Sequence, residues 1–322
     1  MDADDRELFG QSLGQVAADH TGTALDVALE QLGWCDALAD DDEAAISLLF
    51  GHLGSTNSTC GALDHVIAAA LGVDADTAGI VLSPLGGSRL PGRLVGADGG
   101  ARVDIAGLGT ARLLRQPTVL VPVARGDKAI VVPIPAPALT VQQRGGIDDA
   151  LALVDVSGAV LDVDAASCQP VQWSDAVALA QMAIGHELVG ESRRMLELAR
   201  EHALGRVQFG QPISGFQAIR HRLAETLVAI ETAEALLSGA WEDRSPVTAA
   251  MAKAASGRAA RTTARHAQQV LAGIGFTTEH PFHLYVRRVL VLDEIFGSAR
   301  SLTADLGADI LRTRELPPLL PL

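Results

Sequence analysis

The sequence has few cysteines, few lysines and no long apolar run. Its three cysteines, Cys35, Cys60 and Cys168, are odd in number and show no C-x-x-C spacing, which favours a reduced compartment. No run of about 18 apolar residues occurs, so no membrane-spanning helix is expected. The first residues, MDADDRELFG, are acidic and polar, unlike a signal peptide. We therefore expect a cytoplasmic protein with no membrane partner.

Positive charge is scarce as well. The chain has 25 Lys and Arg residues against 39 Asp and Glu residues, which gives a formal net charge of −14. Nucleic acids and anionic membranes are bound through basic patches that neutralise phosphate, so this balance opposes a nucleic-acid partner. No H-x-x-x-H pattern with a nearby carboxylate occurs among the nine histidines, and we expect no metal site.

What the chain does have is enough apolar content for a substantial core. It has 322 residues, of which 48% are apolar, and a chain of this size can form one large domain or about two to three small ones. The residue pattern changes character twice along the chain. We expect an N-terminal helical domain over 1–72, a middle β domain over 73–165 and a C-terminal helical bundle over 170–322.

The two outer regions carry helical periodicity, and the middle region does not. Helices are expected first at 6–20, 23–33, 43–53 and 60–71. Long helices joined by short turns predict an antiparallel bundle, with helices at 174–203, 212–241, 246–271, 281–291 and 298–312. The middle region has a hairpin pattern, TVLVPVARGDKAIVVPIP, and short apolar runs that predict a β-barrel or sandwich, at 78–82, 101–105, 150–155 and 159–163.

One corner of the predicted bundle, GRVQFGQPISGFQAIRHRLAETL, carries the most specific local signal. Gly210 and Pro212 interrupt the helical pattern, and an apolar stripe at helical spacing resumes after them. Arg206 and Gln208 then lie on a turn between two long helices. An arginine there can bind a phosphate or carboxylate, or it can be an ordinary solvated helix-end residue.

Two segments of the sequence resemble motifs of one family. RVQFGQPISGFQAIRHRLAE resembles the R-x-Q-F-G-x-P-I-x-x-F-Q-A-I-x-H-x-L-A-[DE] segment of acyl-CoA dehydrogenases, which are flavoproteins that desaturate acyl-CoA thioesters. HAQQVLAGIGFTTEHP resembles their Q-x-x-G-G-x-G-[YF]-T-x-E-x-P segment. The order of a helical domain, a β domain and a helical bundle is also that of the family. The resemblance is specific over about 170–312 and weaker over 1–165.

The resemblance implies a set of FAD-binding residues. In the family, the bundle corner reaches the FAD of a neighbouring subunit, and its arginine contacts the pyrophosphate. By position, the corner residues implied here are Arg206, Gln208, Phe209, Ile213 and Gln217. The second motif adds Gln269, Gly273 and Gly275, with Ala272 in place of the remaining glycine. A helix C-cap is the structural alternative for the two glycines.

The family's catalytic residues are not matched. The glutamate of the family's Y-E-G-T segment, which removes the α-proton, corresponds to Phe296, and the alternative base position on the first bundle helix corresponds to Ala180. The flavin-binding T-E-P-x-x-G-S-D loop corresponds to the degraded segment 82–89, LSPLGGSR. The family's tryptophan-containing strand is missing, because no tryptophan lies between Trp34 and Trp173.

This asymmetry predicts a non-catalytic subunit of a heteromeric acyl-CoA dehydrogenase, for example a heterotetramer, that is inactive alone. A paralogous partner would carry the base and the acyl-CoA pocket, and the two chains would share FAD. The resemblance also suggests a steroid side-chain CoA ester as the substrate. Two alternatives remain, namely a self-sufficient homo-oligomeric enzyme that uses Glu294 as a relocated base and a flavin-free scaffold protein.

Overall fold

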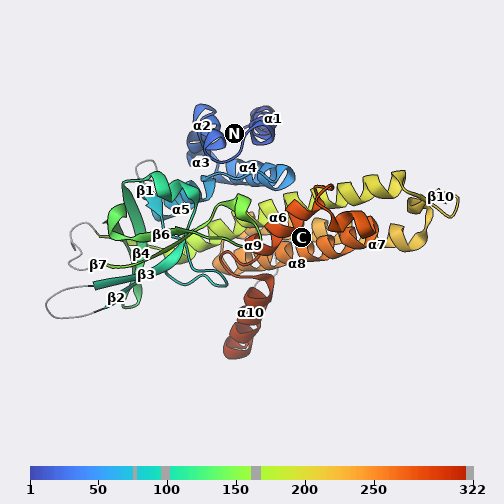
Figure 1. Cartoon of the computed structure of the whole chain (residues 1–322). Coiled ribbons are helices and arrows are strands. Elements are labelled where there is room, and N and C mark those ends of the chain that lie inside the picture. Colours follow the sequence, from blue (N-terminus) through green and yellow to red (C-terminus); the bar gives the residue numbers. More distant parts are fainter. Residues whose placement is uncertain (75–77, 96–101, 161–167, 317–322) are drawn as a thin grey trace.

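The computed structural model describes residues 1–74, 78–95, 102–160 and 168–316. The chain begins with five helices: α1 (Ala3–Asp19), α2 (Thr23–Gln31), α3 (Trp34–Asp40), α4 (Asp42–Thr56) and α5 (Ala62–Leu71). They cover one side of the molecule (Figure 1). Helix α3 is the one helix here that the periodicity does not predict. It forms because Trp34 and Leu38, one turn apart, are both buried.

The middle of the chain forms an eight-stranded sheet, in which β6, β7, β3, β2, β4, β5 and β8 follow one another and β1 pairs with β4. The strands are β1 (Ala78–Ile80), β2 (Gly92–Val95), β3 (Arg102–Gly109), β4 (Thr118–Arg125), β5 (Lys128–Pro135), β6 (Thr140–Gln143), β7 (Val154–Val160) and β8 (Gln169–Val171). The predicted hairpin is β4–β5, closed where Arg125 pairs with Lys128.

One predicted strand run is largely wrong. The run expected at 150–155 begins inside a 3₁₀ turn, Asp149–Leu151, and Ala152 has a positive φ of 51°, so the strand starts only at Val154. The run expected at 159–163 belongs to β7 as far as Val160. Its remaining residues lie outside the described part of the chain.

The rest of the chain is a helical bundle with α6 (Trp173–Gly205), α7 (Gln217–Asp243), α8 (Pro246–Leu271), α9 (Phe282–Leu292) and α10 (Ala299–Thr313). The side chain of Ser245 caps α8, and Pro246 occupies the first helical position. Helix α7 starts later than predicted, because residues 207–215 form a short hairpin and a 3₁₀ turn. Helix α10 projects from the body (Figure 1).

Helix α6 is the central element, and buried residues along it pack against the N-terminal helices, the sheet and the rest of the bundle. Helices α4 and α6 cross with their backbones in close approach. A Cβ added at Gly54 would lie 2.1 Å from the carbonyl oxygen of Glu187, so only glycine fits there. Among the described residues, no helix is long and apolar enough to cross a membrane.

Candidate functional site

The predicted bundle corner is a projecting tip. Helix α6 ends at Gly205, and Val207–Gln208 (β9) pairs with Gln211–Pro212 (β10) across a two-residue turn. Both turn residues, Phe209 and Gly210, have positive φ values, 53° and 80°. This is the geometry of a type I′ hairpin turn. Figure 1 shows the tip at the far end of the bundle from the sheet.

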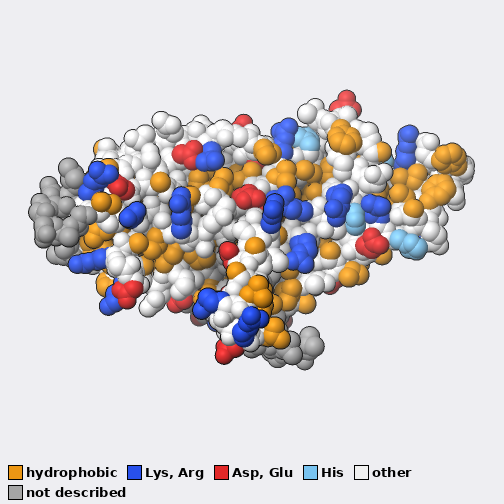
Figure 2. Space-filling view, turned by 90° about the horizontal axis from the view of Figure 1, so that it is seen from below, with side chains coloured by type: hydrophobic (Ala, Val, Ile, Leu, Met, Phe, Trp, Pro, Cys, Tyr) orange, Lys and Arg blue, Asp and Glu red, His pale blue; other side chains and the backbone are white. Residues whose placement is uncertain are grey.

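The tip exposes the residues that the first motif indicates. Arg206, Gln208 and Gln217 are exposed, and Ile213 is half-buried. The ring of Phe209 is 92% exposed and contacts the molecule mainly through an edge-on arrangement with Phe216, with ring centroids 6.1 Å apart. Hydrophobic side chains gather at the same end in Figure 2. A large exposed ring on a strained turn is unusual for a surface loop.

The second motif lies at the same end of the bundle as the first. The hydroxyl of Thr226 on α7 and Nδ1 of His266 on α8 are 2.8 Å apart. Because α7 and α8 are joined by a short turn and run antiparallel, this contact places the end of α8 beside the start of α7. The second motif, which follows α8, therefore lies toward the end of the bundle at which α7 begins.

The backbone of the second motif is open to an approaching group. Gly273 is exposed, and nothing lies within 4 Å of the position where a Cβ would be. Ala272 adopts a φ of 52° and a ψ of −129°, which suits glycine better than alanine, so the backbone keeps a glycine-like conformation without the glycine. Gly275 is different, since a Cβ there would meet Gln268 at 2.6 Å.

The segments aligned with the family's flavin loop and base touch each other directly. The backbone N–H of Gly86 donates to the carbonyl oxygen of Glu294 at 2.9 Å. The indole N–H of Trp173 donates to the carbonyl oxygen of Ser88 at 2.9 Å. The ring of Trp173 also packs on the ring of Phe296, with centroids 6.2 Å apart. The loop 82–89 and the segment 294–296 thus form one packed contact.

Phe296 is a core residue. Its side chain is 1% exposed, and its carbonyl oxygen accepts a hydrogen bond from the Gln181 amide at 2.9 Å. Its φ of 55° is in the left-handed region, which is rare for a bulky residue. Ala180, the other position aligned with a base, is fully buried in α6. Neither side chain can accept a proton.

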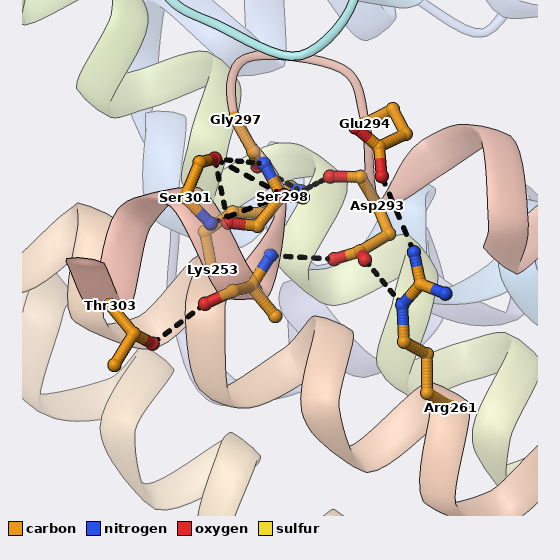
Figure 3. Close-up of polar contacts among 9 residues, drawn as sticks. Lys253, Arg261, Asp293, Glu294, Gly297, Ser298, Ser301 and Thr303 are labelled. Carbon is orange, nitrogen blue, oxygen red and sulfur yellow. Dashed lines mark hydrogen bonds and ion pairs between the residues drawn. The ribbon is translucent and has the colours of Figure 1, made fainter. Parts of the chain in front are cut away.

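A buried lysine holds the turn that contains Phe296 (Figure 3). The ammonium group of Lys253 donates to the carbonyl oxygens of Asp293 and Gly297 at 3.0 and 3.2 Å. Asp293 accepts from the backbone N–H of Ala299 and, at 2.6 Å, from Nε of Arg261. Burial lowers the pKa of Lys253 to about 8. These contacts fix the connection between α9 and α10.

Glu294, the candidate for a relocated base, is a surface residue. Its side chain is 40% exposed, and its carboxylate lies 3.4 Å from the Arg261 guanidinium. A carboxylate in this position is solvated and ion-paired. A general base should instead face a substrate in a site that excludes water.

The sequence did not indicate a buried charge cluster around Arg288. This guanidinium is fully buried, donates to Asp148, and lies 3.6 Å from the carboxylate of Glu187. Burial raises the pKa of Glu187 to about 7 and that of Glu191 well above its usual value. The glutamates at 187 and 191 fall on the apolar face of α6, and this pattern could have indicated buried charges in the sequence. Glu187 lines a cavity of about 320 Å³ with Phe50, Ile184 and other mostly apolar residues.

Comparison with known proteins agrees with this architecture. Residues 174–311 match the family model described as acyl-CoA dehydrogenase, C-terminal domain. The chain is 28% identical over 326 residues to the acyl-CoA dehydrogenase IpdE2 of Mycobacterium tuberculosis, covering 95% of this chain and 98% of that protein. The chain is thus similar to acyl-CoA dehydrogenases, by the family model over its C-terminal bundle and by this relative over most of its length. It is also 35% identical to the acyl-CoA dehydrogenase FadE34 of M. tuberculosis over 44% of this chain and 22% of that protein.

Solved structures with this fold include chains of two complexes. A chain of the ChsE4–ChsE5 complex from Mycobacterium tuberculosis superposes with a TM-score of 0.82 at 20% identity, covering 99% of both chains. A chain of a variant of the Tcur3481–Tcur3483 steroid acyl-CoA dehydrogenase superposes with a TM-score of 0.79 at 18% identity, covering 97% of this chain and 99% of that chain. These likenesses establish the acyl-CoA dehydrogenase fold, with N-terminal helices, a middle sheet and a helical bundle.

Similarity to acyl-CoA dehydrogenases implies FAD, and the two ends of this cofactor fit the chain differently. The tip offers an exposed guanidinium, exposed amides and an exposed aromatic ring, and the second motif adds an open glycine; these groups suit a diphosphate and an adenine. At the other end, Trp173 and Phe296 pack on each other in the segments that would face the ring. The described residues therefore fit the adenosine diphosphate end and not the flavin ring.

Proposed function

We propose that this chain is the base-lacking subunit of a heteromeric, FAD-dependent acyl-CoA dehydrogenase. The observation that carries the proposal is the buried Phe296 in the place of the family's glutamate, packed on Trp173. The exposed tip supports it, because residues 206–213 project away from the sheet of their own chain (Figure 1). Structural similarity to chains of the ChsE4–ChsE5 complex and of Tcur3481–Tcur3483 supports a paralogous partner.

The proposed role of this chain is to bind one end of a shared cofactor. Arg206 would pair with the diphosphate, where each charged hydrogen bond contributes about 1.5–3 kcal/mol. Phe209 and Ile213 would contact the adenine, and the backbone at Gly273 would allow close approach. The amides that would complete the site are Gln208, Gln217 and Gln269. When bound, FAD supplies the hydride acceptor for α,β-desaturation of an acyl-CoA thioester.

The substrate class is the second part of the proposal. The partner would supply the base and the acyl pocket, so the acyl group is recognised outside this chain. We propose a steroid side-chain CoA ester, which is supported by the fold shared with a steroid acyl-CoA dehydrogenase. Turnover of such an ester by the assembled complex, compared with a straight-chain acyl-CoA of equal length, tests this part separately.

Co-expression with a full-length homologue from the same host tests the subunit role. We expect a stable complex that carries FAD, and a colourless, inactive product when this chain is expressed alone. Arg206→Ala should lower the FAD content of the complex at least tenfold at limiting FAD, because one or more charge-assisted hydrogen bonds to the diphosphate are lost. Arg300→Ala, at an exposed position on α10, is the matched control and should leave the FAD content unchanged.

Three results would contradict the subunit role. FAD bound by the isolated chain and reduced by an acyl-CoA would indicate a self-sufficient enzyme, and loss of that activity in Glu294→Gln would identify its base. An unchanged FAD content in Arg206→Ala would indicate a scaffold without a cofactor role. Failure of the homologue and this chain to associate would remove the heteromeric assembly itself.

A further inference from the structure

A pocket far from the tip contains a nucleophilic side chain that the proposed function does not use. Its volume is about 340 Å³, and its lining residues all lie between 23 and 116, on α2, α3, α5 and the 3₁₀ turn Ala111–Arg115. Cys35, Trp34, His65 and Arg112 line it together. Cys35 is exposed, so its sulfur is accessible to a molecule that enters the pocket.

The contacts of His65 determine which ring nitrogen carries the proton. The thiol sulfur of Cys35 lies 3.4 Å from Nδ1 of His65. On the other side of the ring, a guanidinium nitrogen of Arg112 contacts Nε2. Because a guanidinium can only donate, Nε2 must be the acceptor, and the neutral ring therefore carries its proton on Nδ1. That N–H points at the sulfur of Cys35.

This arrangement favours the thiolate form of Cys35. A hydrogen bond donated to sulfur and the nearby cation of Arg112 both stabilise the negative charge, and the thiolate is the reactive form of cysteine. Of the two carboxylates that line the pocket, Asp26 is paired with Arg115, and Glu30 acts against the thiolate. The ring of Trp34 packs edge-on against the ring of His65, with centroids 6.1 Å apart and an interplanar angle of 86°. The donor is therefore held in place by packing as well as by Arg112.

Cys60 provides an internal contrast. Burial raises the pKa of this thiol, and the nearby carboxylates of Asp26 and Glu187 act in the same direction, although a hydrogen bond with the backbone of Ala62 opposes them. A thiol in such surroundings stays protonated and reacts slowly. The same chain thus has one thiol in an activating environment and one in a suppressing environment.

We propose that Cys35 is a thiol–disulfide exchange site for low-molecular-weight disulfides. The Cys35 thiolate attacks one sulfur of a small disulfide R–S–S–R, a new S–S bond forms, and the original S–S bond breaks. The electron pair of the broken bond leaves on RS⁻, which takes a proton from water, while the His65 Nδ1–H only donates a hydrogen bond. Cys35 is oxidised to a mixed disulfide, and one sulfur of the small disulfide is reduced to a thiol.

The pocket accounts for the size and chemistry of the bound group R. A volume of about 340 Å³ lies at the lower end of the range for small-molecule sites, about 300–1,000 Å³. Trp34 and Leu29 give the pocket an apolar side, and the ion pair of Arg115 with Asp26 gives it a polar side. A small peptide-like thiol with both polar and apolar groups matches these walls.

Oxidised glutathione is the probe that tests the proposal, with peptide mapping by mass spectrometry as the readout. At pH 7 the full chain should form one mixed disulfide, located at Cys35. The Cys35→Ser variant should form no mixed disulfide on the same time scale. Cys60→Ser/Cys168→Ser, which retains only Cys35, should react as fast as the parent chain. Preferential modification of Cys60 or Cys168 would overturn the assignment.

The role of His65 is tested by the pH dependence of the exchange rate. His65→Phe keeps an aromatic ring against Trp34 but removes the N–H, so the rate at pH 7 should fall about tenfold. At about pH 10 an ordinary thiol is ionised without help, and the two rates should converge. Equal rates at pH 7, or a Cys35 rate no faster than that of free cysteine, would overturn the proposal. Circular dichroism of His65→Phe checks that the fold is intact.

Discussion

Two phenylalanines adopt a backbone conformation that normally suits glycine. Phe209 at the tip has a φ of 53°, and Phe296 in the core has a φ of 55°. A left-handed conformation costs a non-glycine residue roughly 1–2 kcal/mol. Burial against Trp173 offsets this cost for Phe296, whereas Phe209 is 92% exposed and its ring lies edge-on to that of Phe216. Strain without compensation in the isolated chain is typical of a residue whose packing partner lies in another molecule.

The strain at Phe209 can be measured with a pair of substitutions. Both Phe209→Gly and Phe209→Ala remove the ring contact with Phe216, but only glycine adopts the positive φ at this position without strain. Phe209→Gly should therefore be more stable than Phe209→Ala by about 1 kcal/mol in urea unfolding. At Phe216, where φ is −82°, the same pair should show no advantage for glycine. Equal stability of the two Phe209 variants would contradict the left-handed turn.

The connection between α9 and α10 depends on two buried polar residues. Lys253 reaches it from α8 and binds two carbonyl oxygens, while Asp293 caps the start of α10 and pairs with Arg261 (Figure 3). Ser298 and Ser301 complete a capping box at the same helix end. This element keeps Phe296 in the core.

Removal of the Asp293 carboxylate should weaken this connection. Asp293→Ala removes the acceptor of the Ala299 N–H and of the Arg261 Nε–H, and we expect a loss of about 2–3 kcal/mol in the free energy of unfolding. Asp293→Asn retains an oxygen for the helix cap and should lose less. Glu294→Gln is the matched control, because this neighbour also pairs with Arg261 but is exposed, and its effect should stay within about 0.5 kcal/mol. If Asp293→Ala and Glu294→Gln lowered the free energy of unfolding by similar amounts, the capping role of Asp293 would be contradicted.

For the whole molecule, the sequence pattern predicted the long elements better than the short ones. The bundle helices fall within a few residues of their expected ranges, because each carries many turns of apolar periodicity. Helix α3 and the late start of β7 were missed, since short segments are decided by tertiary packing such as the burial of Trp34. Residues 206–217 were predicted from a motif, and the structure adds that most of them are exposed at one end of the bundle.

The buried charges were beyond the sequence pattern for a different reason. Asp148 and Glu187 are each more than a hundred residues from Arg288 in the sequence. They meet it only because α6 and the loop that contains Asp148 both pack against α9. Desolvation of each group depends on all elements that surround it. The sequence showed glutamates on an apolar helix face, but their partner could not be inferred from spacing.

Glu187 should make the stability of the whole chain depend on pH. Burial raises its pKa from 4.5 to about 7, partly offset by Arg288 and reinforced by Asp148. The folded state therefore binds a proton more tightly than the unfolded state. The stabilisation is complete below about pH 4.5 and is lost as pH rises through about 7, by about 3 kcal/mol in total.

Glu187→Gln tests this dependence, because the amide cannot ionise. The variant should gain stability relative to the parent as pH rises from about 4.5 to 8, with the difference in free energy of unfolding increasing by about 2–3 kcal/mol. Urea unfolding at several pH values measures the difference directly, and changes at other groups largely cancel between the two proteins. Glu197→Gln, on the exposed face of the same helix, should differ from the parent by no more than about 0.5 kcal/mol at any pH. A flat difference for Glu187→Gln would mean that Arg288 keeps this carboxylate ionised in the folded chain.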